Sequence, residues 1–338
     1  MINIGIIGCG NVAVHHMNAV AEIDCAQITG VYTTNLAEGT AFAEKYGITA
    51  LSSLDEMLSD KNISIVSICT PSGTHADIAI KAMAAGKHVM VEKPLALTVE
   101  DCEAVIAASK KYNRKCQVIC QLRFSDTTRI VKEAIDSGAL GKIVNSGCYM
   151  KYYRDESYYK DSDWRGTVRF DGGGALMNQG IHGVDLMIYL LGMPKSVTGV
   201  AKTLLHDIEV EDCAAAIVSY ENGGVGVIEG TTCVYPGYDR RFQICGTKGS
   251  ITLCEDTIEK WDLDIPCPVG TGDKRSVSGA SDPTTLNHSG HRKEYIDLIN
   301  AIENDTDVAN GPDKALEPVK LILSIYESSK NEKVIKFS

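Results

Sequence analysis

Short apolar runs alternate with amphipathic stretches over the first 120 residues of the chain. The apolar runs have the length and composition of buried strands, which we predict at Ile2–Ile7, Ala26–Tyr32, Ile63–Cys69, His88–Val91 and Cys116–Cys120. The stretches between them have a helical period, and we predict helices at Val12–Glu22, Leu36–Tyr46, Leu54–Leu58, His75–Ala85 and Val99–Tyr112. This alternation is typical of βαβ units around a parallel sheet.

The pattern changes after residue 121, where a predicted helix at Thr127–Ser137 leads into longer segments of strand character. These segments predict strands at Ile143–Tyr153, Ser196–Leu205, Asp212–Tyr220, Gly224–Thr232, Arg240–Gly246 and Ser250–Leu253. Turn signals at Glu221–Gly224 and Gly246–Gly249 indicate hairpins and hence an antiparallel sheet. A surface loop at Asp264–Asn287 and helices at His291–Glu303 and Lys314–Ser329 follow. We therefore predict an α/β domain over residues 1–120 and an α+β domain over residues 121–338.

Length and composition narrow the class of protein. The 338 residues agree with two domains of roughly 100–200 residues each. With 33 basic and 44 acidic residues the net charge is −11, which argues against nucleic acid or an anionic membrane as a partner. No apolar run reaches the ~18 residues of a membrane helix, and the apolar N-terminus carries neither a basic leader nor a cleavage site. The twelve cysteines are scattered without a C-x-x-C pair, so we expect reduced thiols and a cytoplasmic protein.

The motif Gly8–Ala13 stands between the first predicted strand and the first predicted helix. Its sequence, Gly-Cys-Gly-Asn-Val-Ala, matches the dinucleotide fingerprint G-x-G-x-x-G/A. In that fingerprint the first glycine allows a tight turn, the second lets the backbone approach the pyrophosphate, and the last small residue packs helix on strand. The N–H groups of the helix N-terminus then hold the diphosphate, whereas the alternative is a tight structural turn. The candidate cofactor contacts in this motif are Gly8, Cys9, Gly10, Asn11 and Val12.

In a dinucleotide-binding domain, residues at the end of the second strand contact the ribose of the cofactor. A domain that prefers NAD usually carries Asp or Glu there, about 20 residues after the glycines. Here the sequence is Val-Tyr-Thr-Thr-Asn over residues 31–35, without a carboxylate and without an Arg for a 2′-phosphate. We predict Thr33 as a ribose contact, and the choice between NAD and NADP stays open.

Four blocks of the sequence, Gly8–Ala13, Thr70–His75, Gly86–Pro94 and Gly172–His182, resemble the Gfo/Idh/MocA oxidoreductase family. The resemblance implies a Rossmann domain, a second domain with a large open sheet used in oligomerisation, and a homodimer or homotetramer. It also implies NAD- or NADP-linked oxidation of a ring hydroxyl in a sugar, sugar derivative or cyclitol. Within the family, the block Leu176–His182 looks most like nucleotide-sugar 3-dehydrogenases that act on UDP-N-acetylglucosaminuronate.

The second and third of these blocks supply further cofactor contacts that the resemblance implies. They are Thr70, Pro71, His75, Glu92 and Lys93.

Lys93 directly follows the predicted strand His88–Val91 and the adjacent Glu92. In an open α/β sheet, ligands bind outside the carboxyl ends of the strands, so Lys93 is placed to reach one. Oxidation of an alcohol needs a group that stabilises the developing alkoxide or takes its proton, and a lysine beside a cationic nicotinamide can do either. We predict Lys93 as a catalytic residue that also contacts the substrate. Glu92 is either a structural partner or a contact.

The segment Gly174–Leu191 has a helical period, and Asn178, His182 and Asp185 in it are spaced to share one face. We predict His182 as the general base, because its ordinary pKa suits neutral pH. A hydrogen-bonded core histidine is the alternative. Asn178 stands where the family often has Asp, so we predict that it binds the sugar by hydrogen bonds.

Further substrate contacts are predicted in segments where a cation or an aromatic ring would hold a sugar, namely Arg123, Trp164 and Arg165. The histidines outside these blocks show no metal-ligand spacing, so we predict no metal site. The leading hypothesis is an NAD(P)-dependent sugar dehydrogenase. The alternatives are a glycoside-cleaving enzyme that works through a transient 3-keto sugar on a tightly held cofactor, and a non-catalytic cofactor- or sugar-binding regulator.

Overall fold

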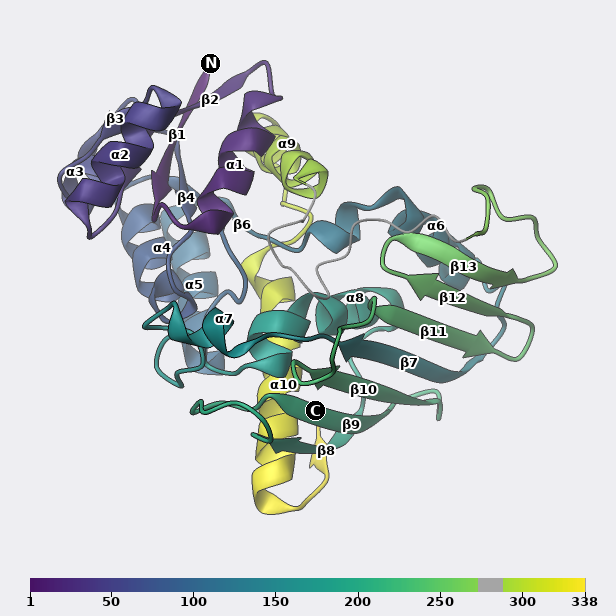
Figure 1. Ribbon diagram of the computed structural model, residues 1–338. Coiled ribbons are helices and arrows are strands. Elements are labelled where there is room, and N and C mark those ends of the chain that lie inside the picture. The colour runs from purple at the N-terminus through teal and green to yellow at the C-terminus, as the bar shows by residue number, and fades with distance from the viewer. Residues whose placement is uncertain (273–287, 338) are drawn as a thin grey trace. The chain divides into compact units, whose positions relative to one another are not determined.

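The computed structural model describes residues 1–272 and 288–337, and the chain divides into two compact units (Figure 1). The first unit comprises residues 1–121 and 287–316, and the second comprises residues 122–286 and 317–338. The boundary predicted from sequence at residue 120 assigned everything after it to one domain. The structure instead groups residues 287–316 with the N-terminal unit.

A six-stranded parallel sheet in the order β3-β2-β1-β4-β5-β6 forms the centre of the first unit. Its strands are β1 (Ile2–Ile7), β2 (Ala26–Tyr32), β3 (Thr49–Ala50), β4 (Ile65–Ile68), β5 (His88–Val91) and β6 (Cys116–Val118). The helices between them are α1 (Asn11–Ala21), α2 (Leu36–Tyr46), α3 (Leu54–Ser59), α4 (His75–Ala84) and α5 (Val99–Tyr112). The predicted parallel sheet is confirmed. The strand order reverses at β1, and in such sheets ligands bind at the carboxyl ends of the strands next to this reversal.

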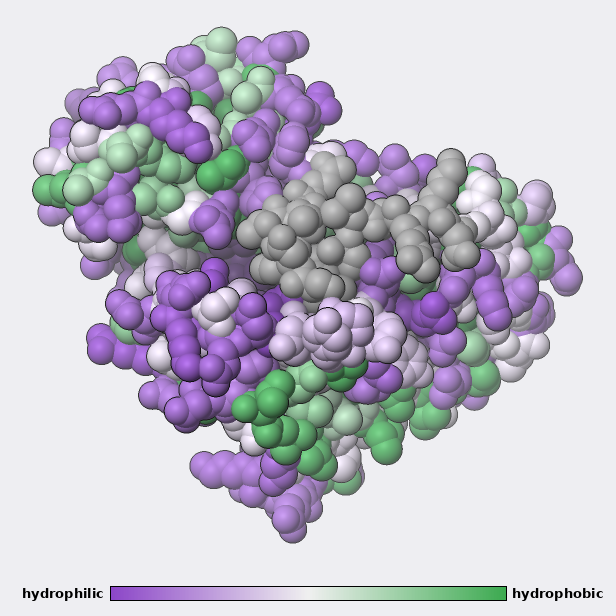
Figure 2. Space-filling view, in the orientation of Figure 1, coloured by the Kyte–Doolittle hydropathy of each residue, from purple (hydrophilic) through white to green (hydrophobic). Residues whose placement is uncertain are grey.

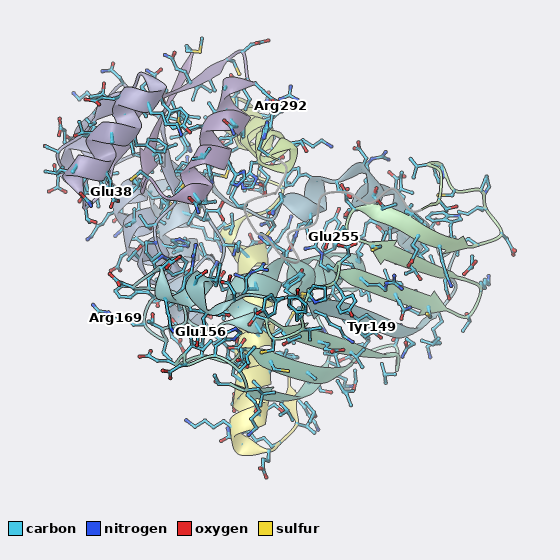
Figure 3. All side chains as sticks on the ribbon, in the orientation of Figure 1. Glu38, Tyr149, Glu156, Arg169, Glu255 and Arg292 are labelled. Carbon is cyan, nitrogen blue, oxygen red and sulfur yellow. The ribbon has the colours of Figure 1, made fainter. Side chains whose placement is uncertain are left out.

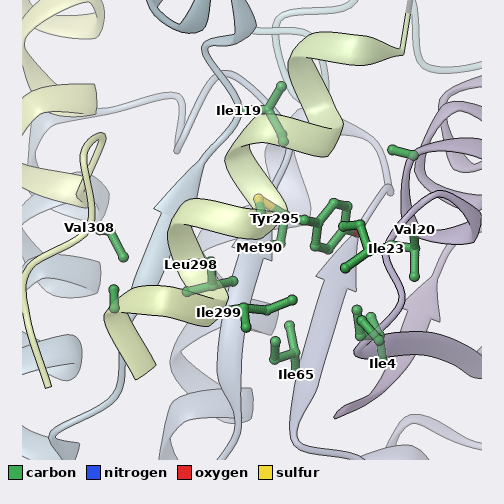
Figure 4. Packing of buried hydrophobic residues seen from close by; sticks show 13 residues of the cluster. Ile4, Val20, Ile23, Ile65, Met90, Ile119, Tyr295, Leu298, Ile299 and Val308 are labelled. Carbon is green, nitrogen blue, oxygen red and sulfur yellow. The ribbon is translucent and has the colours of Figure 1, made fainter. Parts of the chain in front are cut away.

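Helix α9 (Ser289–Asn304) completes the core of the first unit (Figure 4). Tyr295 and Leu298 are fully buried in it, together with Ile4 of β1, Ile65 of β4 and Met90 of β5. The amphipathic pattern of this helix shows that one face is buried. It does not show which sheet that face covers, and for this reason the sequence boundary differs from the structural one.

The second unit is built on an eight-stranded sheet in the order β13-β12-β11-β7-β10-β9-β8-β14. Its strands are β7 (Ile143–Lys151), β8 (Ser196–Lys202), β9 (Cys213–Ser219), β10 (Val225–Thr231), β11 (Arg241–Gly246), β12 (Ser250–Cys254), β13 (Thr257–Asp262) and β14 (Ile335–Lys336). Only the pair β7–β10 is parallel among these strands, so the predicted, mainly antiparallel sheet is confirmed. The short strands β13 and β14 were not predicted.

The helices of the second unit are α6 (Asp126–Asp136), α7 (Glu156–Lys160), a π-helical turn η3 (Ala175–Gly180), α8 (Ile181–Leu191) and most of α10 (Pro312–Asn331). Two short 3₁₀ turns, η1 (Ser72–Thr74) and η2 (Gln121–Phe124), complete the described elements. The predicted loop Asp264–Asn287 lies largely outside the described residues.

The sheet of the second unit has one covered face and one open face. Gly183 of α8 packs against Cys148 of β7, and the N–H of Gly199 in β8 donates to Ser328 of α10 at 3.0 Å. On the opposite face the apolar side chains of Val200 and Ile217 are 56% and 60% exposed. Apolar residues gather over the lower strands of this sheet in the space-filling view (Figure 2). Within residues 1–272 and 288–337, no helix is both long enough and apolar enough to cross a bilayer.

Candidate active site

The glycine loop has the geometry that the fingerprint requires. Gly8 follows β1 with φ +95°, and a Cβ there would lie 2.7 Å from the carbonyl oxygen of Cys69. A Cβ on Gly10, in contrast, would meet no atom of the described residues within 4 Å. Ala13 is fully buried, and the first turn of α1 has neither a side-chain cap nor an acidic residue. The residues present therefore fit a dinucleotide diphosphate, because the backbone at Gly10 is open and the N–H groups of α1 carry no side-chain cap.

The ribose end of this site contains a carboxylate that the sequence analysis missed. Asn35 caps α2 and donates to Glu38 Oε1 at 2.8 Å. Glu38 lies on the first turn of this helix (Figure 3). Burial is the main cause that raises the pKa of the Cys9 thiol, a hydrogen bond with Thr33 lowers it, and the charge of Glu38 adds to the rise. Glu38 therefore lies close enough to the glycine loop for its charge to act on Cys9. It is three residues beyond the strand-end position that sequence reasoning searches, on the first turn of the helix.

The loops after β4 and β5 end at the same edge of the sheet as the glycine loop. Ile7 pairs with Ile68, and Ile68 pairs with Val91. His75 is buried between the two loops, with Nδ1 at 2.7 Å from the carbonyl oxygen of Pro94 and Nε2 at 2.8 Å from that of Thr70. Both ring nitrogens of His75 thus bind backbone carbonyl groups of the protein, and the cofactor contacts predicted for Thr70, Pro71 and His75 stay predictions.

Lys93 is half-buried and follows the fully buried Val91 and the buried Glu92. The Glu92 carboxylate accepts from His16 Nε2 at 3.0 Å, from His291 Nε2 at 3.4 Å and from the backbone N–H of Lys93 at 3.2 Å. Burial alone raises the pKa of Glu92, but the two histidines outweigh burial and leave its pKa well below the ordinary value. Glu92 is therefore a buried anion next to the predicted catalytic lysine.

In the second unit, the turn that leads to His182 is not the α-helix that the sequence predicted. Ala175–Gly180 forms a π-helical turn, in which Gln179 N donates to the carbonyl oxygen of Gly174 at 3.1 Å. The buried carboxylate of Glu211 holds the start of the turn, since it accepts from Gly174 N at 2.9 Å and Leu176 N at 2.8 Å. His182 follows as the second residue of α8 and is half-buried. The wider turn changes the angular spacing between Asn178 and His182 that the i, i+4 pattern implied.

Asn178 and Asp185, which were expected on one helix face with His182, each bind a partner inside the second unit. Asn178 is buried and donates to Asp171. Asp185 is fully buried and forms a two-pronged ion pair with Arg123, at 2.8 Å to Nε and 2.6 Å to Nη2. This pair engages Nε and Nη2 of Arg123 inside the unit, and its substrate contact stays a prediction.

Several polar residues that sequence reasoning missed surround the turn. Gln179 Nε2 donates to the Tyr158 hydroxyl at 2.7 Å, and Gln179 Oε1 accepts from Arg154 Nη2 at 2.7 Å. The Arg165 guanidinium lies 4.3 Å from the Tyr158 ring and 5.5 Å from the Trp164 ring. The structure thus brings the predicted Trp164 and Arg165 into the network that also holds Asn178. The tyrosine-rich run 152–159 is the signal that could have located it.

Two clusters of metal-ligand type occur among the described residues, His16–Glu92–His291 and His206–Asp212–Cys233. In the first, both histidines already contact the carboxylate. In the second, His206 is 3.1 Å from Asp212 Oδ2 through Nδ1 and 2.9 Å from the Arg154 carbonyl oxygen through Nε2. The hydrogen bonds account for both clusters, and the absence of a metal site stays a prediction.

Comparison with known proteins decides the family. Residues 2–120 match the model described as the oxidoreductase family with an NAD-binding Rossmann fold, and residues 128–252 match the GFO/IDH/MocA C-terminal domain. The chain belongs to the Gfo/Idh/MocA oxidoreductase family. The first unit of this oxidoreductase is therefore an NAD-binding Rossmann domain, as its glycine loop indicates.

Similar members of the family act on cyclitols and sugars. The chain is 30% identical over 264 residues to scyllo-inositol 2-dehydrogenase (NAD(+)) of Bacillus subtilis, which covers 75% of this chain and 73% of that protein. It is 30% identical to the WlbA dehydrogenase from Bordetella pertussis in complex with NADH and UDP-GlcNAcA, with a TM-score of 0.89 over 100% of this chain and 99% of that one. Levoglucosan dehydrogenase in complex with NADH and L-sorbose is 25% identical, with a TM-score of 0.87 over 100% and 99% of the two chains.

Proposed function

We propose that this oxidoreductase transfers hydride between a nicotinamide cofactor and a ring hydroxyl carbon of a sugar, sugar derivative or cyclitol. The observation that carries the proposal is the common sheet edge at which the glycine loop, the Thr70 loop and Lys93 follow paired strand ends. A cofactor seated on the loop and a catalytic lysine then belong to one edge of one rigid sheet.

The roles of the residues follow from their chemistry. When bound, the cofactor supplies the hydride acceptor. The N–H groups at Gly10, Asn11 and Val12 hold its diphosphate, with Gly8 and Cys9 shaping the loop and Thr33 at the ribose. The ammonium of Lys93 stabilises the developing alkoxide, and His182 takes the hydroxyl proton as general base. Asn178, Trp164 and Arg165 position the sugar, with Arg123 as the remaining candidate contact.

Within this class, we propose a nucleotide sugar that carries a uronate carboxylate as the substrate. The block Leu176–His182 supports this choice, as does the similarity to the WlbA dehydrogenase, whose complex contains UDP-GlcNAcA. The similarity to cyclitol dehydrogenases makes inositols the natural comparison compounds.

The experiment is a substrate panel with the purified protein. Formation of NADH or NADPH is followed at 340 nm with inositols, free sugars, UDP-N-acetylglucosamine and UDP-N-acetylglucosaminuronate, in parallel with NAD and NADP. Turnover of the uronate at least tenfold above UDP-N-acetylglucosamine supports the full proposal. Turnover of inositols alone supports only the dehydrogenase class. Cleavage of a glycoside without net NADH, or binding without turnover, contradicts the proposal.

We further propose that the open face of the second unit's sheet joins copies of this chain in a homodimer or homotetramer. Val200, Ile217 and Val225 project from one face of β8, β9 and β10 and are each about half exposed or more, at 47–60%. Substituting Ile217→Lys tests this, because a charge there would lower the mass measured by light scattering from that of an oligomer to that of a monomer.

All twelve cysteines are free thiols, which supports a reducing compartment such as the cytoplasm.

A further inference from the structure

A hydrogen-bonded cluster lies beneath Lys93 and links three elements of the first unit. Tyr295 of α9 is fully buried, and its hydroxyl is 2.7 Å from Nδ1 of His16 in α1. Nε2 of the same ring is 3.0 Å from Glu92 Oε1. The other carboxylate oxygen accepts from the backbone N–H of Lys93. The helix that begins at the glycine loop is thus connected to the catalytic lysine through one imidazole and one carboxylate.

The chemistry of the groups decides where the protons lie. A carboxylate only accepts, so Nε2 of His16 carries the hydrogen and Nδ1 is the acceptor. Ser67 Oγ is 3.0 Å from that Nδ1 and 2.5 Å from the Tyr295 hydroxyl, so one of the two hydroxyls donates to the ring and the other completes the chain. Burial lowers the pKa of His16, although Glu92 partly offsets the effect, which agrees with a neutral ring that donates to an anion.

Glu92 therefore has three N–H donors of the protein: His16, His291 and the Lys93 backbone. Each of them points to a fixed carboxylate that is buried, not one exposed to a ligand. Removal of one donor would leave a buried charge short of a partner, and the strand end at Lys93 would move to compensate.

We infer that Glu92 and His16 are positioning residues: they hold the backbone at Lys93 in register with helix α1 and act on catalysis only through that lysine. This inference rests on the proposed function, in which Lys93 is catalytic. The sequence predicted that Glu92 contacts the dinucleotide directly. We infer instead that Glu92 supports the backbone at Lys93.

The test is a kinetic and binding comparison of Glu92→Gln, His16→Leu and His16→Gln. We expect Glu92→Gln to lower kcat by roughly 10–100-fold, the effect of about 1 Å of misplacement, and to change the Kd for NADH less than twofold. His16→Leu should lower kcat similarly. His16→Gln should recover at least threefold over Leu, because its amide can still donate to Glu92. A double variant, His16→Leu with Glu92→Gln, should be no slower than Glu92→Gln alone.

The matched control is His15→Leu. His15 is the neighbouring histidine of the same helix, and its ring lies 6.1 Å from the His291 ring between centroids, without a hydrogen bond to Glu92 among the described contacts. Its kcat should stay within twofold of the wild type. Equal losses in the two histidine variants, or a Kd for NADH raised tenfold in Glu92→Gln at unchanged kcat, would overturn the positioning role.

One measurement separates this inference from the proposed function. Nitrogen-15 NMR of histidine-labelled protein reports the His16 tautomer without any turnover, and it should show a protonated Nε2 and a bare Nδ1. If the wild type turns over no compound of the panel, the proposed function fails. The His16 tautomer still tests the hydrogen bond from His16 to Glu92 in that case. A ring protonated at Nδ1 would overturn the positioning role of His16 and Glu92 even in an active enzyme.

Discussion

The loop Gly8–Ala13 and the turn Gly172–His182 are both rich in glycine, yet their conformations have different causes. In the loop, the positive φ of Gly8 and the close carbonyl of Cys69 are conditions that glycine itself meets. In the turn, the π geometry depends on Glu211, which is 35 residues from Leu176, and on Tyr326, whose hydroxyl donates to Glu211 at 2.7 Å from 115 residues further on. A motif encoded locally is readable from sequence, whereas a turn shaped by distant partners is not.

The largest effect is expected on NADH binding, and it should differ between the two glycines of the loop. Gly10 has φ −71° and open space around its Cβ position, so Gly10→Val should fold normally and lose NADH binding, because the side chain blocks the pyrophosphate. Gly8→Ala should instead destabilise the fold by roughly 1–3 kcal/mol, since an L-residue is strained at φ +95°. NADH fluorescence titration and thermal unfolding of both variants measure this. Normal NADH affinity in Gly10→Val would remove the assigned role of the loop.

The next effect concerns the turn and its two candidate residues. His182→Ala should lower kcat by ~10²–10⁴, the usual range for a positioned acid–base group, with cofactor binding intact. Asn178→Ala should act mainly on KM, because it removes a contact made about equally in the ground and transition states. Lys93→Ala should resemble His182→Ala, and the double variant should be less than additive. Near-normal turnover of His182→Ala would place His182 among the core histidines.

The difference between loop and turn also explains how much the sequence could predict. The strands of the first unit, except the two-residue β3, and the antiparallel sheet of the second follow from local periodicity and are confirmed. The glycine loop follows from its motif, and its contacts with the cofactor stay a prediction. The assignment of α9 to the first unit depends on which sheet its apolar face meets. The roles of Glu211, Tyr158 and Gln179 depend on partners far away in the chain. Periodicity over Gly174–Leu191 indicated a helix but could not distinguish a π turn from an α turn.

A third prediction concerns Glu211, the residue distant in sequence that holds the start of the turn. Glu211→Gln should destabilise the protein by about 1–3 kcal/mol near neutral pH, since its amide cannot accept from both Gly174 N and Leu176 N as well as the Tyr326 hydroxyl. It should also lower kcat several-fold, because the turn carries Asn178 and leads to His182. Urea unfolding and the kinetic assay measure the two effects. Glu209→Gln, an exposed carboxylate two residues earlier, is the matched control and should change neither, because its amide oxygen can still accept from Val168 N.

The effect of Glu211→Gln on the free energy of unfolding should depend on pH. Burial raises the pKa of Glu211 above its ordinary value of 4.5, although its hydrogen bonds partly offset the rise. The folded chain then keeps this proton to higher pH than the unfolded chain. The resulting stabilisation is complete below the unfolded pKa and is lost as pH rises through the folded pKa. The difference in unfolding free energy between wild type and Glu211→Gln should therefore shift against the wild type as pH rises above about 4.5. A constant difference from pH 4 to 7 would contradict the raised pKa.

The smallest expected effect concerns the glycine loop again and tests whether a charge from the neighbouring helix influences the choice of cofactor. Glu38 acts on Cys9 from the first turn of α2, where we expect a carboxylate to repel the 2′-phosphate of NADP. Glu38→Gln should therefore shift the ratio of kcat/KM values for NAD and NADP towards NADP by about two- to fivefold, the scale of an exposed charge. Glu44→Gln, on the same helix and also exposed, should leave the ratio unchanged. If both variants leave it unchanged, Thr33 alone reads the ribose, and the cofactor preference is encoded as locally as the glycine turn.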